Sequence, residues 1–372
     1  MRNALRSIVV VTLLLNTAYA QQNYLLTGTY TKGKSEGIYV YDFNSNTGNS
    51  SFVSKIKSVN PSFLAVSPNQ HFVYAVNEEG NGKGGKISSY SFNRSTGMLQ
   101  FINQQLSGGD DPCYVEVDKA GKWVVLANYS GGSLSIFPVE NNGSLGEATT
   151  NIQHTGSSIN KDRQEKAHVH STFFSPDNKY LLVQDLGMDE ITVYPFNEKK
   201  GTLNLRKRKI IKSTPGAGPR HIVFSNHHKF VYAIHELSGT VSAYKFKRGK
   251  LKLVEEVSAS QPGFTGFMGS ADIHISGDDN FLYCSNRGDA NTISIFKIDK
   301  DNGKLTIAGY QSTLGLGPRN FNFDPSGNFL IVANQNSDNI VIFKINKETG
   351  LLIDTGKRID VGSPVCLKWI DK

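Results

Sequence analysis

Two arginines and a histidine occupy the same place in three similar stretches of the chain. Arg220 and Arg319 each follow Gly-Pro, and His170 follows Val169 at the start of a comparable run of β-branched and aromatic residues. Guanidinium and imidazole groups suit the binding of an anion or pairing with a carboxylate. They are costly to bury in a protein interior unless they do one or the other. These residues therefore predict an anion-binding site.

More ionisable residues recur one strand further along the chain. Four of them stand at the ends of the next apolar segments: Glu78, Asp185, Glu236 and Arg287. His168 and His221 lie within two residues of the first set, and Asp272 follows Ala271, which holds the equivalent position in another blade. The alternative to a functional site is a ring of charges that only neutralise one another, because buried ion pairs also occur without a catalytic role.

The strands that must position these residues belong to a repeat. A six-residue apolar segment recurs about every 50 residues, a spacing typical of propeller blades. Its seven copies begin at Tyr24, Phe72, Trp123, Tyr180, Phe230, Phe281 and Phe329. Each copy continues into a third strand, and a Thr-Gly or Asn-Gly hairpin turn then usually leads to a fourth. The sequence predicts an all-β fold, a seven-bladed propeller with four-stranded antiparallel blades.

The two ends of the repeat are incomplete in complementary ways. The first unit begins at its second strand, at Tyr24, while the chain ends on a lone first strand, residues 364–370. We expect this C-terminal strand to join the N-terminal blade and close the ring, which removes exposed strand edges. With the first strand of each blade innermost, its start meets the end of the second strand on one face. The ionisable residues should gather there, at the mouth of the central channel.

The first 20 residues are typical of a secretory signal. Arg2 and Arg6 precede an apolar run, and Ala18-Tyr19-Ala20 has the small-x-small pattern of a cleavage site. The run is far shorter than the roughly 20 residues that a membrane-spanning helix needs. We predict a signal peptide over residues 1–20 and a single propeller domain over residues 21–372. The mature protein should be exported, to the periplasm or the medium, and should not stay attached to a membrane.

The composition limits the classes of binding partner that are expected. The formal net charge is +8, falling to +6 without Arg2 and Arg6, and no basic helix or aromatic RNA-binding motif accompanies this mild excess, so nucleic acid is not expected. The one dense basic run, residues 206–212, should be a solvated outer strand. The three cysteines cannot all pair and should be buried thiols. Neither a metal nor another cofactor is predicted, and the sequence does not indicate an oligomeric state.

Several ordered motifs together resemble one family. They are Gly218-Pro-Arg-His-Ile-Val-Phe, the His-x-His of His168 and His170, Ala271-Asp-Ile-His-Ile with Asn286-Arg-Gly, and Gly317-Pro-Arg-Asn-Phe. These motifs are similar to those of the seven-bladed lactonase family, which includes the propeller-type 6-phosphogluconolactonases and the fungal carboxymuconate lactonizing enzymes. The resemblance covers residues 24–370. One departure is the strand before Glu236, which ends in Ile-His where the family commonly has Asn before the Glu.

The resemblance implies a set of site residues. His170, Arg220, Glu236 and Arg319 would form the active site, and we expect the substrate to be bound by His168, His221, Asp272 and Arg287. The substrate would be a small anionic lactone or sugar acid.

The leading hypothesis is hydrolysis of a sugar lactone or a related anionic lactone, as in the 6-phosphogluconolactonases. Ester hydrolysis needs an activated water and stabilisation of a developing oxyanion. Glu236 or His170 would act as general base. One of Arg220 and Arg319 would grip the anionic group of the substrate, and the other would polarise the carbonyl.

Two other functions are compatible with the same residues. The site could run in the direction of lactone formation, as a cycloisomerase acting on an unsaturated acid of the muconate type. An exported propeller could also bind a carbohydrate or another protein without catalysis, since the fold alone does not define an activity.

Overall fold

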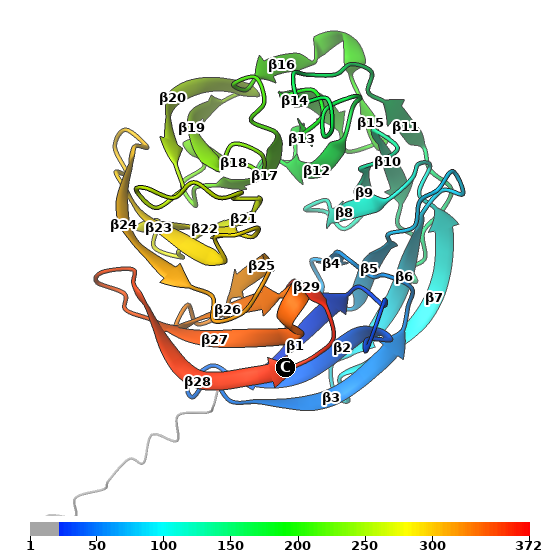
Figure 1. Ribbon diagram of the computed structural model, residues 1–372. Coiled ribbons are helices and arrows are strands. Elements are labelled where there is room, and N and C mark those ends of the chain that lie inside the picture. The colour runs from blue at the N-terminus through cyan, green and yellow to red at the C-terminus, as the bar shows by residue number, and fades with distance from the viewer. Residues whose placement is uncertain (1–21) are drawn as a thin grey trace, which may run out of the picture.

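Each sequence repeat folds into one antiparallel sheet, and the sheets stand as blades around a central channel (Figure 1). The computed structural model describes residues 22–372, so the expected signal peptide, residues 1–20, lies outside the described residues. Six blades have four strands, and one has a split outer strand that gives it five. The predicted all-β seven-bladed propeller is confirmed.

The strands of each blade follow one another from the channel outward. The first three blades are β29 (Pro364–Asp371), β1 (Gln22–Thr29), β2 (Gly37–Asn44) and β3 (Ser50–Lys57); β4 (Leu64–Val66), β5 (Phe72–Asn77), β6 (Lys86–Asn93) and β7 (Met98–Leu106); and β8 (Pro112–Val117), β9 (Trp123–Asn128), β10 (Ser133–Pro138) and β11 (Thr150–Gln153). The fourth is β12 (Val169–Phe174), β13 (Tyr180–Asp185) and β14 (Glu190–Asn197), with β15 (Thr202–Leu203) and β16 (Lys209–Lys212) both pairing with β14.

The remaining three blades have the regular four strands. They are β17 (Pro219–Phe224), β18 (Phe230–His235), β19 (Thr240–Lys247) and β20 (Lys250–Ser258); β21 (Ser270–Ile275), β22 (Phe281–Asn286), β23 (Thr292–Ile298) and β24 (Leu305–Ser312); and β25 (Pro318–Phe323), β26 (Phe329–Asn334), β27 (Asn339–Ile345) and β28 (Leu352–Asp360). Two short 3₁₀ helices, η1 (Leu205–Lys207) and η2 (Gln335–Ser337), complete the secondary structure of the described residues.

The ring closes where the two chain ends meet. β29 pairs with β1 in antiparallel register, for example Leu25 with Trp369, and Leu367 and Ile370 of β29 are fully buried. In Figure 1 the red C-terminal strand lies beside the blue N-terminal strand within one blade. The predicted closure by the C-terminal strand is therefore confirmed.

Burial follows the position of a strand within its blade. The second strands β18, β22 and β26 are buried at every residue, because neighbouring blades pack against both faces of each sheet. Outer strands such as β3 and β20 alternate between exposed and half-buried residues instead. The three cysteines are free and buried, as expected. The continuous apolar segments of the repeat thus become the rigid middle of each blade.

The inner strands carry a shared irregularity next to the channel mouth. In β12, β17 and β25 the pairing with the second strand skips one residue, and the skipped residues are His170, Arg220 and Arg319. An extra unpaired residue of this kind is a β-bulge, which bends the strand and turns its side chains. The bulges lie at the positions where the sequence places its ionisable residues.

Glycine sets up the entry to two of these strands. Gly218 and Gly317, just before Pro219 and Pro318, have φ of +68° and +68°, a conformation that other residues adopt only with strain. A Cβ on Gly218 would also lie 2.8 Å from Cγ of Leu237. The Gly-Pro-Arg motif is therefore a backbone requirement that brings the arginine to the channel mouth.

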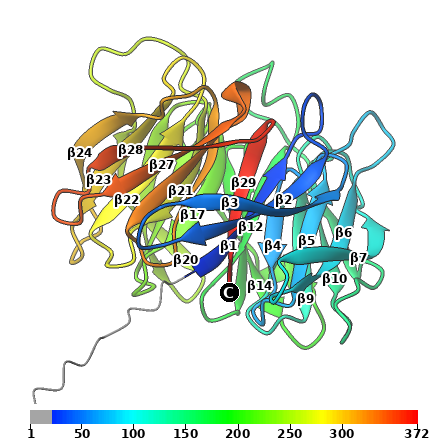
Figure 2. The same cartoon turned by 90° about the horizontal axis from the view of Figure 1, so that it is seen from below.

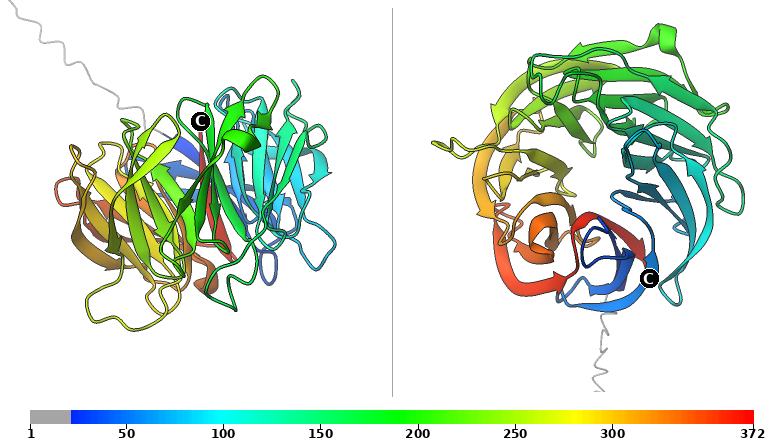
Figure 3. Two further views of the ribbon diagram at one scale, coloured as in Figure 1. Left: turned by 90° about the horizontal axis from the view of Figure 1, so that it is seen from above. Right: turned by 45° about the vertical axis from the view of Figure 1, so that its right-hand side comes forward.

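Seen edge-on, the ring is a thick disc with loops extending from both faces (Figure 2; Figure 3, left). The tilted view shows the blades succeeding one another around the channel (Figure 3, right). The basic run at 206–212 lies on η1 and β16 at the outer edge of its blade, where its side chains are mostly exposed, in agreement with the expected solvated strand. Within residues 22–372, no helix has the length and apolar character needed to cross a membrane.

Candidate active site

A cavity of about 480 Å³ opens at the channel mouth, where the inner strands begin. It is lined by Tyr30, Glu78, Cys113, Tyr129, Arg163, His170, Glu236, Phe267, Arg287, Gly288, Gly317, Arg319, Gln335 and Asn336.

Two positions in the repeat supply most of this wall. The first residue after the second strand of a blade lines the cavity in six blades: Tyr30, Glu78, Tyr129, Glu236, Arg287 and Gln335. In the remaining blade this residue is Leu186, which is buried elsewhere. The second residue of the inner strand contributes Cys113, His170 and Arg319. The same two positions of the repeat therefore line one cavity, with different side chains in different blades.

Glu236 is the centre of an ion-pair cluster. Its Oε2 accepts a hydrogen bond from Nε of Arg220 at 2.9 Å and pairs with Nη2 of Arg287 at 2.9 Å. Its Oε1 accepts from Nη2 of Arg163 at 2.7 Å. Burial alone would raise the pKa of Glu236, but Arg287, Arg220 and Arg163 together lower it below the ordinary range. The carboxylate is therefore ionised and fully engaged at neutral pH, which makes it a weak proton acceptor.

Arg220 lies behind Glu236 and not on the cavity wall. It is 2% exposed, and besides its bond to Glu236 its Nη1 donates to the backbone oxygen of Ala271. Burial, with Arg287 and Arg319 nearby, lowers the pKa of Arg220 to about 9. Nε and Nη1 of this guanidinium are thus bonded to the protein, and Arg220 is placed to hold Glu236 in position.

Arg319 faces the cavity and has different neighbours from Arg220. Its guanidinium carbon lies 5.4 Å from the centre of the Tyr30 ring, a cation–π contact. It forms no ion pair with any carboxylate of residues 22–372. The Tyr30 hydroxyl donates to Oε1 of Glu78 at 2.8 Å. Arg319 is therefore a cavity-facing cation whose hydrogen-bonding capacity is available to a substrate.

The sequence contains the reason for this difference between the two arginines. Each arginine follows Gly-Pro at the start of an inner strand. The two blades differ in the residue that comes directly after the second strand. That residue is Glu236 beside Arg220, and in the blade of Arg319 it is Gln335. With a neutral amide in place of the carboxylate, Arg319 forms no ion pair among residues 22–372.

His170 lines the cavity next to the cluster. Its Nε2 is 3.9 Å from Oε2 of Glu236, too long for a hydrogen bond, and Tyr129 packs edge-on against its ring. Burial lowers the pKa of His170 well below its usual value, helped by the positive charge of Arg220. The ring is therefore neutral at pH 7 and has a lone pair to accept a proton.

Three residues expected to bind substrate do not line the cavity. His168 stacks on Tyr129 at 4.5 Å and so supports that side chain from behind. His221 and Asp272 lie one layer deeper in the channel and bond to each other at 2.8 Å. His221 follows the bulged Arg220 by one position, and Asp272 lies within the irregular pairing between Ser270 and Ile273. Of the four residues expected to bind substrate, Arg287 is the one on the cavity wall.

Asp185 also lies away from the cavity. It is the last residue of β13, one position short of the residue that faces the channel, and it is fully buried. Its Oδ2 is bonded to Nδ1 of His154 at 2.8 Å, and its Oδ1 accepts from the backbone of His168.

Sequence reasoning missed Tyr30, Tyr129 and Arg163. The first two stand directly after β1 and β9, a position in the repeat that could have identified them. They were missed because tyrosine is not a charged residue. Arg163 comes from the long loop before β12 and has no counterpart in the repeat. Its contacts with Tyr129 at 3.1 Å and Glu236 at 2.7 Å appear only in the folded structure.

The cavity has a residual positive charge. Three arginines and two glutamates line it, and Arg220 adds a further cation behind the wall. An electropositive cavity favours a negatively charged substrate or transition state. Among residues 22–372, no His, Cys, Asp and Glu side chains gather in a group of three that could hold a metal ion.

Comparison with known proteins defines the class to which this fold and site belong. Residues 24–369 match the family described as lactonase, 7-bladed beta-propeller. The chain therefore belongs to the seven-bladed β-propeller lactonase family.

Individual relatives agree with this assignment. A 6-phosphogluconolactonase of Formosa agariphila is 44% identical over 88% of this chain and 94% of its own length. A 6-phosphogluconolactonase of Bacillus subtilis is 36% identical over 92% of this chain and 97% of its own. The structure of a periplasmic gluconolactonase of Pseudomonas aeruginosa superposes with a TM-score of 0.89 at 36% identity, covering 94% of this chain and 99% of that one.

Proposed function

We propose that this protein hydrolyses a sugar lactone in the cavity at the channel mouth. The observation that carries the proposal is Arg319, a cation without an ion pair among residues 22–372, which faces the same cavity as the neutral imidazole of His170. One side chain can stabilise negative charge and the other can accept a proton, which are the two requirements of ester hydrolysis.

The lactone carbonyl oxygen binds Arg319 in this mechanism. Attack by water converts the carbonyl into a tetrahedral oxyanion, and a fixed guanidinium donates to that oxygen more strongly as its charge grows. Because Arg319 forms no ion pair with a carboxylate of the described residues, it breaks no such pair when it makes this contact. Arg220 keeps its bonds to Glu236 and Ala271 throughout.

His170 acts as the base that activates water. Its Nε2 takes one proton from the attacking water while the water oxygen bonds to the carbonyl carbon. Collapse of the tetrahedral intermediate breaks the bond to the ring oxygen, which receives that proton and becomes a hydroxyl. Glu236, 3.9 Å from Nε2, stabilises the imidazolium that exists between these two steps.

The substrate class follows from the cavity and the relatives. The residual positive charge accommodates an aldonic acid product and would also accommodate a phosphate. Two of the relatives carry the name 6-phosphogluconolactonase and one the name periplasmic gluconolactonase. We infer that residues 1–20 direct export, which places the enzyme where unphosphorylated aldonolactones occur, because phosphorylated sugars cross membranes poorly. The unphosphorylated lactone is therefore the proposed substrate.

A direct assay tests this function. Purified protein comprising residues 21–372 is assayed on gluconolactone and on 6-phosphogluconolactone, with spontaneous hydrolysis subtracted. Turnover of both, with a higher kcat/KM for gluconolactone, is expected. Absence of turnover above background on both lactones would overturn the proposal. Turnover of carboxymuconate would then favour the cyclising enzyme, and saturable binding alone would favour a non-catalytic propeller.

A further inference from the structure

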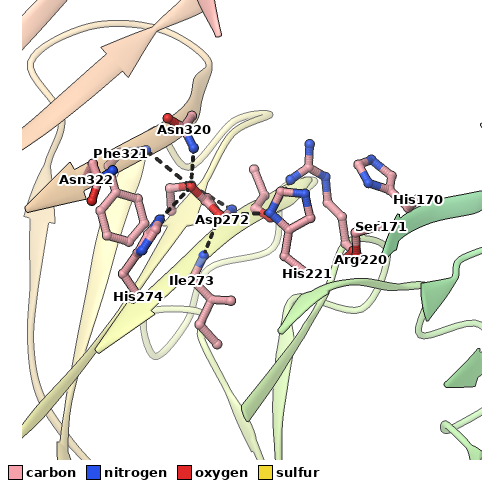
Figure 4. Close-up of polar contacts among 12 residues, drawn as sticks. His170, Ser171, Arg220, His221, Asp272, Ile273, His274, Asn320, Phe321 and Asn322 are labelled. Carbon is pink, nitrogen blue, oxygen red and sulfur yellow. Dashed lines mark hydrogen bonds and ion pairs between the residues drawn. The ribbon is translucent and has the colours of Figure 1, made fainter. Parts of the chain in front are cut away.

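His221 occupies the layer of the channel directly below the active-site cavity. It is buried on all sides, and its ring meets the edges or faces of Phe63, Tyr114 and Phe173 at centroid distances of 5.8, 5.3 and 6.1 Å. Figure 4 shows His221 between Asp272 on one side and Arg220 and His170 on the other. The lower surface of this layer lines a second cavity of about 160 Å³.

Asp272 fixes the protonation of His221. The carboxylate accepts from Nδ1 of His221 at 2.8 Å, from Nε2 of His274 at 3.0 Å, from the backbone of Ile273, and from the side-chain amide of Asn320. A carboxylate with this many donors is ionised. His221 must therefore carry its proton on Nδ1, which leaves a lone pair on Nε2.

That lone pair has no partner among the described residues. Nε2 of His221 is buried without a hydrogen bond, and so is Nδ1 of His170. The two rings are neighbours, with centroids 5.4 Å apart and planes at 72°. If Nε2 of His170 is the lone pair that faces the cavity, its proton is on Nδ1. The His170 ring then has a donor without a partner, Nδ1–H, and the adjacent His221 ring has an acceptor without a partner, Nε2.

Glu236 lies 3.9 Å from Nε2, the other ring nitrogen of His170, and the remaining charged and titratable groups around this pair offer no competing acceptor for the proton on Nδ1. Arg220, which lies beside both rings, is a donor only. Asp272 is already bonded to His221, and His274 contacts Asp272 on the side away from His170. The other titratable groups near Asp272 are Tyr114, Cys284 and Cys366. Glu116 and Lys368 belong to the lower part of the channel.

We propose that His221 and Asp272 are positioning residues for His170: one bridging water accepts from Nδ1 of His170 and donates to Nε2 of His221, and Asp272 orients His221. This inference rests on the proposed function, since it explains how His170 presents an unprotonated Nε2 to the cavity. When His170 takes a proton from the attacking water, the resulting positive charge is shared with His221 and balanced by Asp272. The proton returns from Nε2 to the leaving ring oxygen, so the chain of bonds ends each cycle unchanged.

The test uses His221→Phe, which keeps an aromatic ring among Phe63, Tyr114 and Phe173 but has no nitrogen. We expect kcat for gluconolactone to fall at least about tenfold, part of the 10²- to 10⁴-fold that a general base contributes, with KM changed less than about twofold. The matched control is His274→Asn, which removes the other imidazole on Asp272 and should leave kcat within about twofold of wild type. A fall of kcat in His274→Asn as large as that in His221→Phe would show a structural role of the layer and overturn the inference.

A measurement without turnover separates this inference from the proposed function. ¹⁵N NMR of histidine-labelled protein, with His170 assigned by its loss in His170→Gln, reports which ring nitrogen carries the proton. We expect the proton on Nδ1 in the wild type and a shift toward Nε2 in His221→Phe. A wild-type His170 protonated on Nε2 would overturn the inference even if the lactone is hydrolysed. The expected tautomer in a protein that hydrolyses no lactone would retain the hydrogen bond and reject the proposed function.

Discussion

The proposed chemistry depends on an unprotonated His170. Burial and neighbouring arginines lower its pKa well below the usual histidine value. A base with a lowered pKa stays unprotonated as the pH falls, so kcat/KM should remain level from pH 8 down to about pH 6 and decline only at more acidic pH. The profile is measured between pH 4 and 8 with spontaneous hydrolysis subtracted.

The matching variant is His170→Gln, which removes the base and keeps a polar side chain. We expect it to lower kcat by about 10²- to 10⁴-fold at every pH tested. A wild-type profile that loses half its activity near pH 6.5 would contradict a lowered pKa at His170.

Glu236 should matter for stability as well as for activity. Glu236→Gln removes the only carboxylate that Arg220, Arg163 and Arg287 share among the described residues, so it should destabilise the fold by about 3–5 kcal/mol at pH 7. The pKa of Glu236 is lowered in the folded state. Its contribution is therefore fully present above its unfolded pKa of about 4.3 and lost as the pH falls through the folded value.

The measurement is denaturant unfolding of wild type and Glu236→Gln at pH 7 and at pH 3. The difference in unfolding free energy should be large at pH 7 and smaller at pH 3. An equal difference at both pH values would show that the ion-pair cluster does not account for it.

The identity of the charged residues is readable in the sequence, but their pairing is not. Arg220 and Arg319 have the same Gly-Pro context, and the sequence predicts that both contact the substrate. Their difference depends on whether Glu236 or Gln335 stands across the blade, a comparison that needs the register of two strands. Arg163 could not be predicted, because its loop has no repeat to fix where its side chain goes.

At the scale of strands, the bulges in β12, β17 and β25 place the site. Gly218 prepares the bulge at Arg220 with its φ of +68°. Gly218→Ala should destabilise the protein by about 1–3 kcal/mol, because Ala is strained at positive φ and its Cβ would meet Leu237 at 2.8 Å. It should also reduce kcat, since Arg220 and Glu236 would shift. Thermal unfolding and lactone turnover measure the two effects.

Gly277→Ala is the control for this substitution. A Cβ at Gly277 would have no other atom within 4 Å, and the φ of this residue is not positive, so the variant should resemble wild type in Tm and kcat. Equal Tm values for Gly218→Ala and the wild type would contradict the backbone requirement.

The strands themselves were largely predictable, while their irregularities were not. The second strands are recognisable by continuous apolar residues such as Phe230 to Ile234, which are all buried. A bulge leaves no mark in a pattern of apolar residues, because it changes the pairing partner and not the residue type. The outer strand of the fourth blade is split into β15 and β16 by η1, whereas the repeat predicts a single strand.

At the scale of the whole molecule, the ring depends on its C-terminal strand. β29 pairs with β1 and buries Leu367 and Ile370. Deletion of residues 364–372 would leave β1 with an unpaired edge and open the ring, so the protein should unfold or aggregate. Circular dichroism and size-exclusion chromatography distinguish this from a folded monomer.

The control for the deletion removes Lys372 alone. This residue makes one partly exposed ion pair with Asp42, and such pairs contribute about 0–1 kcal/mol. The shorter protein should fold like the wild type. A cooperative, folded protein lacking residues 364–372 would contradict the role of β29 in closing the ring. This closure was visible in the sequence because the missing first strand and the surplus last strand are complementary.

The measurement that tests the central claim most directly is lactone hydrolysis by Arg319→Ala beside Arg358→Ala. Arg319 forms no ion pair in the described part of the chain, so its loss should leave Tm nearly unchanged and lower kcat/KM for gluconolactone by about 10²- to 10³-fold. Arg358 pairs with Asp354 on an outer strand, and its loss should leave the rate unchanged. Hydrolysis by Arg319→Ala at the wild-type rate would show that this free cation does not stabilise the transition state, and would contradict the assignment of the active site.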